Sequence, residues 1–189
     1  MVRTEADVAE VFDVQPAFES PWLTVHKATV RRSADLSTWY YLDHPGCALV
    51  LPVTTDNRIV LIRVWRVSVR QWCHEAPAGR IEPTEEPIEA ARRELREEIG
   101  GDCTELVHLG TVLASSGSSN ERVHLYVGRN VRLGQASPDP DERIEVVAMT
   151  PDQALDLARS GRIEDAPTAL AVLWAHERKL LHATMCDAS

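Results

Sequence analysis

Residues 79–101 read GRIEPTEEPIEAARRELREEIGG, and this stretch decides the fold class. A helix over residues 85–99 is expected, because apolar side chains recur on one side of it at about 100° per residue. This predicted buried stripe comprises Ile88, Ala91, Leu95 and Ile99. Thr84 is suited to cap the helix. On the same helix Glu94 and Glu98 project together from one flank, one turn apart, with Glu97 further round.

Three glutamates within five residues are locally unfavourable, because like charges at i,i+3 or i,i+4 cost about 0.2–0.5 kcal/mol per pair. A solvated, salt-bridged face is one interpretation, since the glutamates alternate with Arg92, Arg93 and Arg96. The turn at Gly79 and the spacing favour another. Mg²⁺ prefers a few carboxylate oxygens and retained waters, which Glu94 and Glu98 supply. A turn ahead of the helix can bring a backbone carbonyl, such as that of Ala78, beside them.

The same stretch resembles the Nudix box, G-x5-E-x7-R-E-U-x-E-E-x-G-U, where U is apolar. The matching residues are Gly79, Glu85, Arg93, Glu94, Leu95, Glu97, Glu98 and Gly100. Gly101 stands where the box has a bulky apolar residue. Seven fixed residues at background frequencies of about 5–7% make a chance match in one chain on the order of one in a million. The resemblance is therefore specific.

The resemblance implies a role for each matching residue. Glu94 and Glu98 are expected as the main metal ligands, with Glu97 contributing through metal or water. Arg93 is expected to form an ion pair with Glu85 that shapes the loop. The implied ion is Mg²⁺, with Mn²⁺ as an alternative; it would neutralise a pyrophosphate and lower the pKa of an attacking water.

Further segments resemble the ADP-ribose pyrophosphatase branch of the family. They are residues 44–47 (HPGC), residues 64–66 (VWR) and residues 75–79 (EAPAG). By this resemblance Arg66 meets the diphosphate or terminal ribose and Glu75 lines the pocket. A surface salt bridge at a strand end is the other interpretation of Arg66. Val64 replaces the usual Gln of the branch.

Two downstream loops extend the resemblance. Residues 115–121 (SSGSSNE) are similar to the branch signature S-P-G-x-x-x-E, so Ser116, Gly117 and Glu121 are expected to bind substrate, with Ser116 in place of Pro. The acidic loop 134–143 (GQASPDPDER) is expected to supply a metal ligand or general base. Glu142 is the first candidate, with Asp141 and Asp139 behind it, although such a loop is often merely solvated.

The pattern over the whole chain predicts an α/β protein. Expected strands are 23–32, 37–42, 47–53, 59–65, 75–78, 106–113, 123–131 and 144–149, and expected helices are 85–99, 151–160 and 167–181. Residues 34–36 are expected as a turn, and residues 1–20 carry no strong period. Strands without regular βαβ alternation predict a Nudix-like α/β/α sandwich with a mixed β-sheet, plus an N-terminal antiparallel β extension. The expected division is residues 1–44 for the extension and 45–189 for the Nudix domain.

The extension carries clustered aromatic residues, Trp22, Trp39, Tyr40 and Tyr41. Core packing is one interpretation. The resemblance implies another, in which one ring, that of Trp39 in our assignment, stacks on a nucleobase across a homodimer interface.

The composition limits the binding partners and the cellular compartment that we expect. The 189 residues carry a net charge of −9, which argues against nucleic-acid binding. No run of 18 apolar residues and no signal peptide is visible, so no membrane association is expected. The four cysteines are widely spaced, which is typical of reduced thiols in the cytoplasm. The seven histidines show no ligand spacing, and none is assigned to metal.

The expected activity is hydrolysis of ADP-ribose to AMP and ribose 5-phosphate. Ser116 and Val64 leave open a nucleotide sugar such as GDP-mannose, or NADH or another dinucleotide. A non-catalytic Nudix-fold nucleotide-binding regulator is an alternative of another class. Such modules usually lose the ligand carboxylates, whereas all three box glutamates are present here.

Overall fold

The computed structural model describes residues 9–137 and 143–181. The chain divides into two compact units. The first contains the chain up to His44 together with Leu113–Arg122, and the second contains Pro45–Val112 and the chain from Val123 onward. The boundary falls between His44 and Pro45, and a later loop joins the first unit.

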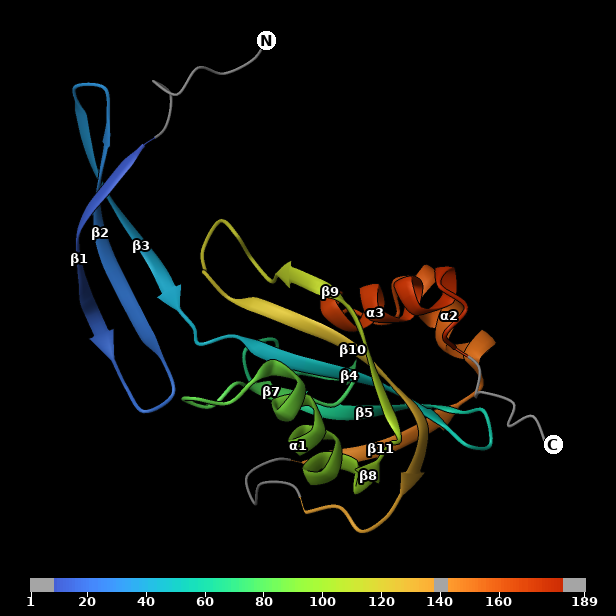
Figure 1. Ribbon diagram of the computed structural model, residues 1–189. Helices are drawn as coiled ribbons and strands as arrows, with labels where there is room; N and C mark the ends of the chain where they lie inside the picture. The colour runs from blue at the N-terminus through green and yellow to red at the C-terminus, as the bar shows by residue number, and fades with distance from the viewer. Residues whose placement is uncertain (1–8, 138–142, 182–189) are drawn as a thin grey trace. The chain divides into compact units, whose positions relative to one another are not determined.

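The first unit is a three-stranded antiparallel sheet with the order β1-β2-β3 (Figure 1). Its strands are β1 (Glu10–Glu19), β2 (Thr24–Arg32) and β3 (Asp35–Asp43). The sequence predicts no strand before residue 23, so β1 corrects that prediction. Two register shifts interrupt its pairing with β2, between Phe12 and Gln15 and between Pro16 and Phe18. They explain why the residues of β1 show no regular alternation. β3 also begins within the predicted turn, at Asp35.

Both faces of this small sheet carry apolar side chains. In the β2–β3 register Ala28 lies opposite Trp39 and His26 opposite Tyr41, so these side chains share one face. The other face presents Phe18, Leu36, Tyr40 and Leu42, all of which are exposed. On this face the apolar side chains alternate with polar ones, because Lys27 is the register partner of Tyr40 and Arg31 that of Leu36.

The second unit is built on an eight-stranded sheet with the path β11-β5-β4-β10-β8. β6 pairs with β5, β7 with β4 and β9 with β10. β4 and β10 are parallel, whereas β5 is antiparallel to its neighbours β11, β4 and β6. The sheet is therefore mixed. Its strands are β4 (Cys47–Thr54), β5 (Ile59–Arg66), β6 (Gln71–Glu75), β7 (Ala78–Arg80), β8 (Gly101–Asp102), β9 (Glu105–Leu113), β10 (Arg122–Leu133) and β11 (Ile144–Met149).

Helices cover both faces of this sheet (Figure 1). The helices are α1 (Pro87–Ile99), α2 (Pro151–Arg159) and α3 (Ala166–Glu177). Alternate residues of β4 point to opposite faces: Ala48 and Val50 pack with α1, and Leu49 and Leu51 with α2 and α3. This burial on both sides explains the unbroken apolar run of β4. The predicted α/β/α sandwich with a mixed sheet is confirmed.

The approach to α1 differs from the prediction in two places. The expected strand 75–78 is split, because β6 ends at Glu75 and β7 begins at Ala78. Pro77 between them has no N–H for a ladder. The helix begins at Pro87 with Glu86 as its N-cap, whereas Thr84 has a positive φ of 71° and does not cap it. Proline at the first helical position sets this start.

The remaining helix predictions are close to the structure. Ala91, Leu95 and Ile99 are buried as expected, but Ile88 in the first turn of α1 is 36% exposed and Ala90 is buried instead. Thr150 caps α2, with Gln153 completing a capping box. Among the described residues, none of the helices is long and apolar enough to cross a membrane.

Candidate active site

The two central glutamates of α1 are buried although they carry charge. Glu94 is 8% exposed and Glu98 is 5% exposed, and they lie one turn apart on the flank of the helix beside β7. Burial of a carboxylate is costly unless it is paired or binds a metal. This helix therefore holds a buried pair of carboxylates that the packing of a hydrophobic core does not require.

Gly79 in β7 makes room for one of these carboxylates. A Cβ atom at position 79 would lie 2.0 Å from Oε1 of Glu94, closer than real contacts allow. Gly79 pairs with Ala48 of β4, which fixes its backbone against the sheet. The Glu94 carboxylate therefore occupies the space of the absent side chain, and a larger residue at position 79 would have to displace it.

The neighbouring strand residue holds the other carboxylate. The N–H of Ala78 donates to Oε2 of Glu98 at 3.1 Å. The short strand β7 thus touches both glutamates, Glu94 through the Gly79 surface and Glu98 through a hydrogen bond. It places Ala78 beside Glu98, where the sequence predicts a carbonyl ligand.

Arg93 is the centre of an ion-pair network around the same helix. Its Nε and Nη2 donate to Glu85 at 3.0 and 3.1 Å, so the ion pair implied by the resemblance is present. Its Nη2 also donates to the Arg80 carbonyl at 2.8 Å, and its Nη1 to Glu94 and to Glu97, the latter at 3.0 Å.

Hydrogen bonds from Arg93 hold the pKa of the Glu85 carboxyl below its usual range, and the same bonds raise the pKa of Arg93. Arg93 therefore ties the loop before α1 to the helix.

The box carboxylates differ in their environment. Glu97 is exposed and bonded to Arg93, whereas Glu94 and Glu98 are buried. Within residues 9–137 and 143–181 there is no group of three or more His, Cys, Asp or Glu side chains already arranged to hold a metal. Glu142, Asp141 and Asp139 lie outside the described residues. The two buried carboxylates and the cradle at Gly79 nevertheless fit a hard cation with oxygen ligands.

Arg66 and Glu75, both predicted to bind substrate, are bonded to each other. Nε and Nη2 of Arg66 donate to the two oxygens of Glu75 at 2.8 and 2.6 Å. The Glu75 side chain is 11% exposed and that of Arg66 is 43% exposed. Such a fork-to-fork pair fixes the plane of the guanidinium. Arg66 is the last residue of β5, at the turn into β6, and Glu75 is the last residue of β6, three residues before β7.

The first turn of α3 supports this pair and the chain that follows it. The Thr168 hydroxyl, which is fully buried, accepts a hydrogen bond from the N–H of Ala76 at 2.9 Å. Asp165 is the N-cap of α3 and accepts from the N–H of Thr168. Burial raises the pKa of the Asp165 carboxyl, and the negative charge of Glu75 acts in the same direction. Thr168 does not stand out in the sequence, because its partner Ala76 lies 92 residues away, whereas Asp165 contacts Thr168 locally as the N-cap of α3.

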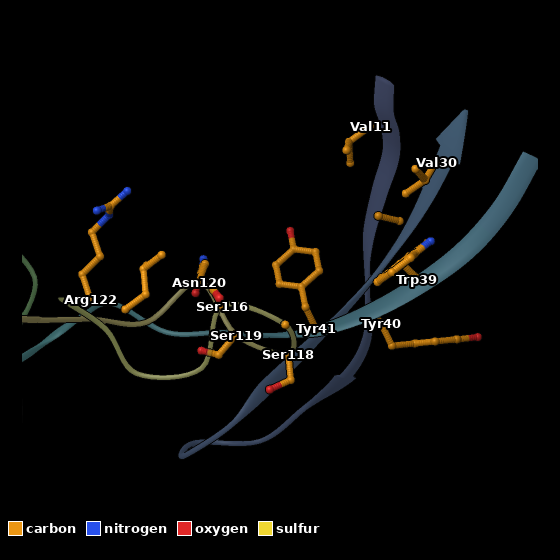
Figure 2. A pocket seen from close by; sticks show the side chains of 13 residues that line it. Val11, Val30, Trp39, Tyr40, Tyr41, Ser116, Ser118, Ser119, Asn120 and Arg122 are labelled. Atoms are coloured by element: carbon orange, nitrogen blue, oxygen red, sulfur yellow. The ribbon is translucent and has the colours of Figure 1, made fainter. Parts of the chain in front are cut away.

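The first unit contains a cavity of about 590 Å³. Its strand side is formed by Val11, Ala28, Val30, Trp39, Tyr40 and Tyr41, and its loop side by Leu113, Ser116, Gly117, Ser118, Ser119, Asn120 and Arg122 (Figure 2). Three predicted substrate-binding residues, Trp39, Ser116 and Gly117, therefore line one cavity. It combines aromatic walls with several hydroxyl groups and the guanidinium of Arg122.

Glu121, the fourth predicted residue of this unit, does not line the cavity. Its carboxylate lies 3.7 Å from Nδ1 of His44. Its neighbour Asn120 accepts from the His44 N–H at 2.8 Å and donates to Asp43. These contacts attach the loop to the end of β3.

Two histidines without ligand spacing in the sequence meet on the sheet of the second unit. Thr111 lies 3.0 Å from Nδ1 of His124 and 3.4 Å from Nε2 of His108. His124 and Ala48 are register partners, as are Ala48 and Gly79, so His124 shares the α1 face of the sheet with the carboxylates.

Comparison with known proteins agrees with this geometry. The family model of the NUDIX domain matches residues 43–170. An ADP-ribose pyrophosphatase of Bacillus subtilis (strain 168) is 33% identical over 142 residues, which cover 74% of this chain and 77% of that protein. A methanol dehydrogenase activator of Bacillus methanolicus is 34% identical over 140 residues, covering 73% and 76%.

Two further proteins match at lower sequence identity. A GDP-mannose pyrophosphatase of Salmonella arizonae is 29% identical over 146 residues, covering 72% of this chain and 75% of that protein. The crystal structure of an ADP compounds hydrolase superposes with a TM-score of 0.78 at 20% identity, covering 90% of this chain and 93% of that one. The family match spans more than half of the chain and contains the buried carboxylates of α1. The chain therefore belongs to the Nudix family and is a Nudix pyrophosphohydrolase.

Proposed function

We propose that this enzyme hydrolyses the diphosphate of ADP-ribose to AMP and ribose 5-phosphate in a Mg²⁺-dependent reaction. The observation that carries the proposal is the buried pair Glu94 and Glu98, held by Gly79 and Ala78 of β7. The relative from Bacillus subtilis, an ADP-ribose pyrophosphatase, supports the choice of substrate.

The carboxylates would hold the cation, with the Ala78 carbonyl, Glu97 and Glu142 as the further ligands proposed from the sequence. A bound Mg²⁺, or Mn²⁺, would offset the negative charge of the diphosphate and make an attacking water more acidic. Arg93 positions Glu94 and joins the loop at Glu85 to the helix. Because Arg93 has four partners, its guanidinium is fixed next to the carboxylates.

A substrate-binding role is proposed for residues of each unit taken by itself. Arg66 is proposed to contact the diphosphate or terminal ribose, and Glu75 holds its guanidinium in one plane. In the first unit the cavity of Trp39, Ser116 and Gly117 is proposed to receive a planar ring and its hydroxyl groups. Glu121 would then act indirectly, by fixing the loop to His44.

We also propose that the enzyme is a homodimer through the exposed face of the small sheet, which carries Phe18, Leu36, Tyr40 and Leu42. Large exposed apolar faces are typical of protein interfaces. Cys47, Cys73 and Cys103 are free thiols, which supports the proposal of a reducing compartment such as the cytoplasm.

A second candidate role is nucleotide-binding regulation, because one relative is named an activator of methanol dehydrogenase. The GDP-mannose pyrophosphatase relative keeps that nucleotide sugar as an alternative substrate. Retention of all three box glutamates supports catalysis over regulation alone.

The test is a hydrolysis panel with Mg²⁺ over ADP-ribose, GDP-mannose, NADH and nucleoside triphosphates, with products identified by chromatography. The highest kcat/KM for ADP-ribose, with AMP and ribose 5-phosphate as products, is the expected result. A higher kcat/KM for GDP-mannose or NADH would replace the substrate assignment, and absence of any hydrolysis would favour the regulatory role.

A further inference from the structure

The segment 75–79 connects the Arg66–Glu75 pair to the carboxylates of α1, and each of its residues is held in place. The contacts, in chain order, are Glu75 with Arg66, the Ala76 N–H with Thr168, the Pro77 carbonyl with the Val50 N–H, the Ala78 N–H with Glu98, and Gly79 with Glu94. Four of these partners come from the sheet or from α1. Thr168 is the only one of the five that comes from α3.

Thr168 makes a specific contact that its position in a helix does not require. Threonine is a weak helix former, and a buried hydroxyl needs partners. Here the hydroxyl accepts from the Ala76 N–H, and the Thr168 N–H donates to the Asp165 carboxylate. Without this hydroxyl the Ala76 N–H would lose its partner at a fully buried site. The hydroxyl therefore fixes the backbone of Ala76 relative to the start of α3.

The backbone between Ala76 and Ala78 is stiff. Pro77 has its φ fixed by its ring, and its carbonyl accepts from the Val50 N–H at 2.9 Å. A displacement at Ala76 cannot easily be absorbed by rotation at Pro77. It would instead change the direction of the Ala78 N–H, which is the group that holds Oε2 of Glu98.

We propose that Thr168 is a positioning residue for the metal-binding carboxylates. From α3 it holds Ala76, so that the Ala78 N–H keeps the Glu98 carboxylate turned toward the cation. The inference rests on the proposed function, in which Glu98 is a metal ligand. It adds a residue that lies outside the Nudix box and touches neither substrate nor cation.

The test uses Thr168→Val, which keeps the shape and removes the hydroxyl. Binding of Mn²⁺ to the full chain is measured from the electron paramagnetic resonance signal of the free ion. Because a buried N–H loses its partner, we expect the Mn²⁺ dissociation constant to rise by about tenfold. Thr168→Ser, which restores the hydroxyl, is expected to recover the wild-type value.

Thr150→Val is the matched control. Thr150 also accepts a backbone N–H, that of Gln153, but it caps α2 and makes none of the contacts of segment 75–79. A general loss of helix stability would affect both valine variants. We expect Thr150→Val to bind Mn²⁺ as the wild type does. Equal Mn²⁺ affinities of Thr168→Val and the wild type would overturn the inference.

A measurement on the wild-type chain covers the case in which Thr168→Val does not fold. If the Thr168 contact favours cation binding, cation binding must strengthen that contact by the same free energy. Mg²⁺ should therefore slow hydrogen exchange in peptides that contain the Ala76 amide, and unchanged exchange would overturn the inference. A wild-type chain that neither binds Mn²⁺ nor hydrolyses the panel would instead refute the proposed function, and the inference with it.

Discussion

At the scale of single residues, the site depends on the close contacts that Gly79, Glu94 and Glu98 make with their neighbours. Gly79 is needed because the Glu94 carboxylate fills the position of a Cβ atom. Glu98 accepts from the Ala78 N–H, and Glu94 is bonded to Arg93, which has three other partners. Substitutions that move these carboxylates by a small distance should therefore affect activity more than stability.

Replacing Gly79 by alanine should displace the Glu94 carboxylate. A misplacement of about 1 Å at a catalytic group costs on the order of 100-fold in rate, so we expect a loss of that size in kcat for ADP-ribose. Gly161→Ala is the comparison, because Gly161 has a φ of 71° but nothing within 4 Å of an added Cβ.

That second variant should lose about 1–2 kcal/mol in free energy of unfolding, the cost of a left-handed backbone for alanine, while keeping full activity. Urea denaturation and steady-state kinetics on both variants check this. Equal activity losses in the two would show that Gly79 acts only through the fold.

At the scale of elements, α3 does more than cover the sheet. Its first turn places Asp165 and Thr168 against the Arg66–Glu75 pair and the strand connection at Ala76. The cost is a half-buried carboxyl at Asp165, whose pKa is raised first by desolvation. The folded state therefore disfavours the charged form of this residue.

Asp165→Asn should stabilise the protein in a pH-dependent manner. A carboxyl with a raised pKa binds more protons in the folded state, so wild-type stability falls as pH rises from the unfolded value of about 3.9 through the higher folded value. Asparagine keeps an oxygen for the Thr168 N–H but does not titrate. The gain in free energy of unfolding should thus be larger at pH 7 than at pH 4 in urea denaturation. A gain independent of pH would contradict the assignment.

The elements also show what a sequence can predict. β4 is evident because it is buried on both faces and uniformly apolar, and α1 because its stripe and the Nudix box coincide. β1 is missed because two register shifts break its alternation. Thr84 is misassigned as a cap because Pro87 determines where α1 starts.

In the site, too, local contacts can be predicted from the sequence and long-range contacts cannot. Glu94, Glu98 and Arg93 lie in one local motif, and their proximity follows from helix geometry. The pairing of Arg66 with Glu75 is not evident from spacing alone, and the contact of Ala76 with Thr168 spans 92 residues. Such long-range contacts depend on the packing of α3 against the sheet, which no local pattern encodes.

At the scale of the whole molecule, the net charge of −9 is opposite to what a phosphate substrate would require. The cation proposed to bind at Glu94 and Glu98 would offset this negative charge. The small sheet exposes Phe18, Leu36, Tyr40 and Leu42 on one face, and this face is the proposed interface of a homodimer.

Phe18→Glu should weaken the proposed homodimer, because it replaces a large exposed apolar side chain of this face by a charged one. We expect a loss of at least tenfold in dimer affinity, which corresponds to about 1.4 kcal/mol. Light scattering during size-exclusion chromatography measures the mass of each species. Arg159→Glu, an exposed change on α2, should leave the mass unchanged. A wild-type chain that is monomeric at all concentrations would contradict the homodimer.

The proposal that Glu98 holds a catalytic cation is tested most directly by the turnover of ADP-ribose by Glu98→Gln at saturating Mg²⁺. Glutamine keeps the volume and an oxygen for the Ala78 N–H, so folding should be retained while the charge that holds the cation is lost. Glu89→Gln, an exposed change on the same helix, is the control and should behave as the wild type. We predict that kcat for Glu98→Gln falls on the order of 1000-fold. Wild-type turnover in a folded Glu98→Gln variant would contradict the account.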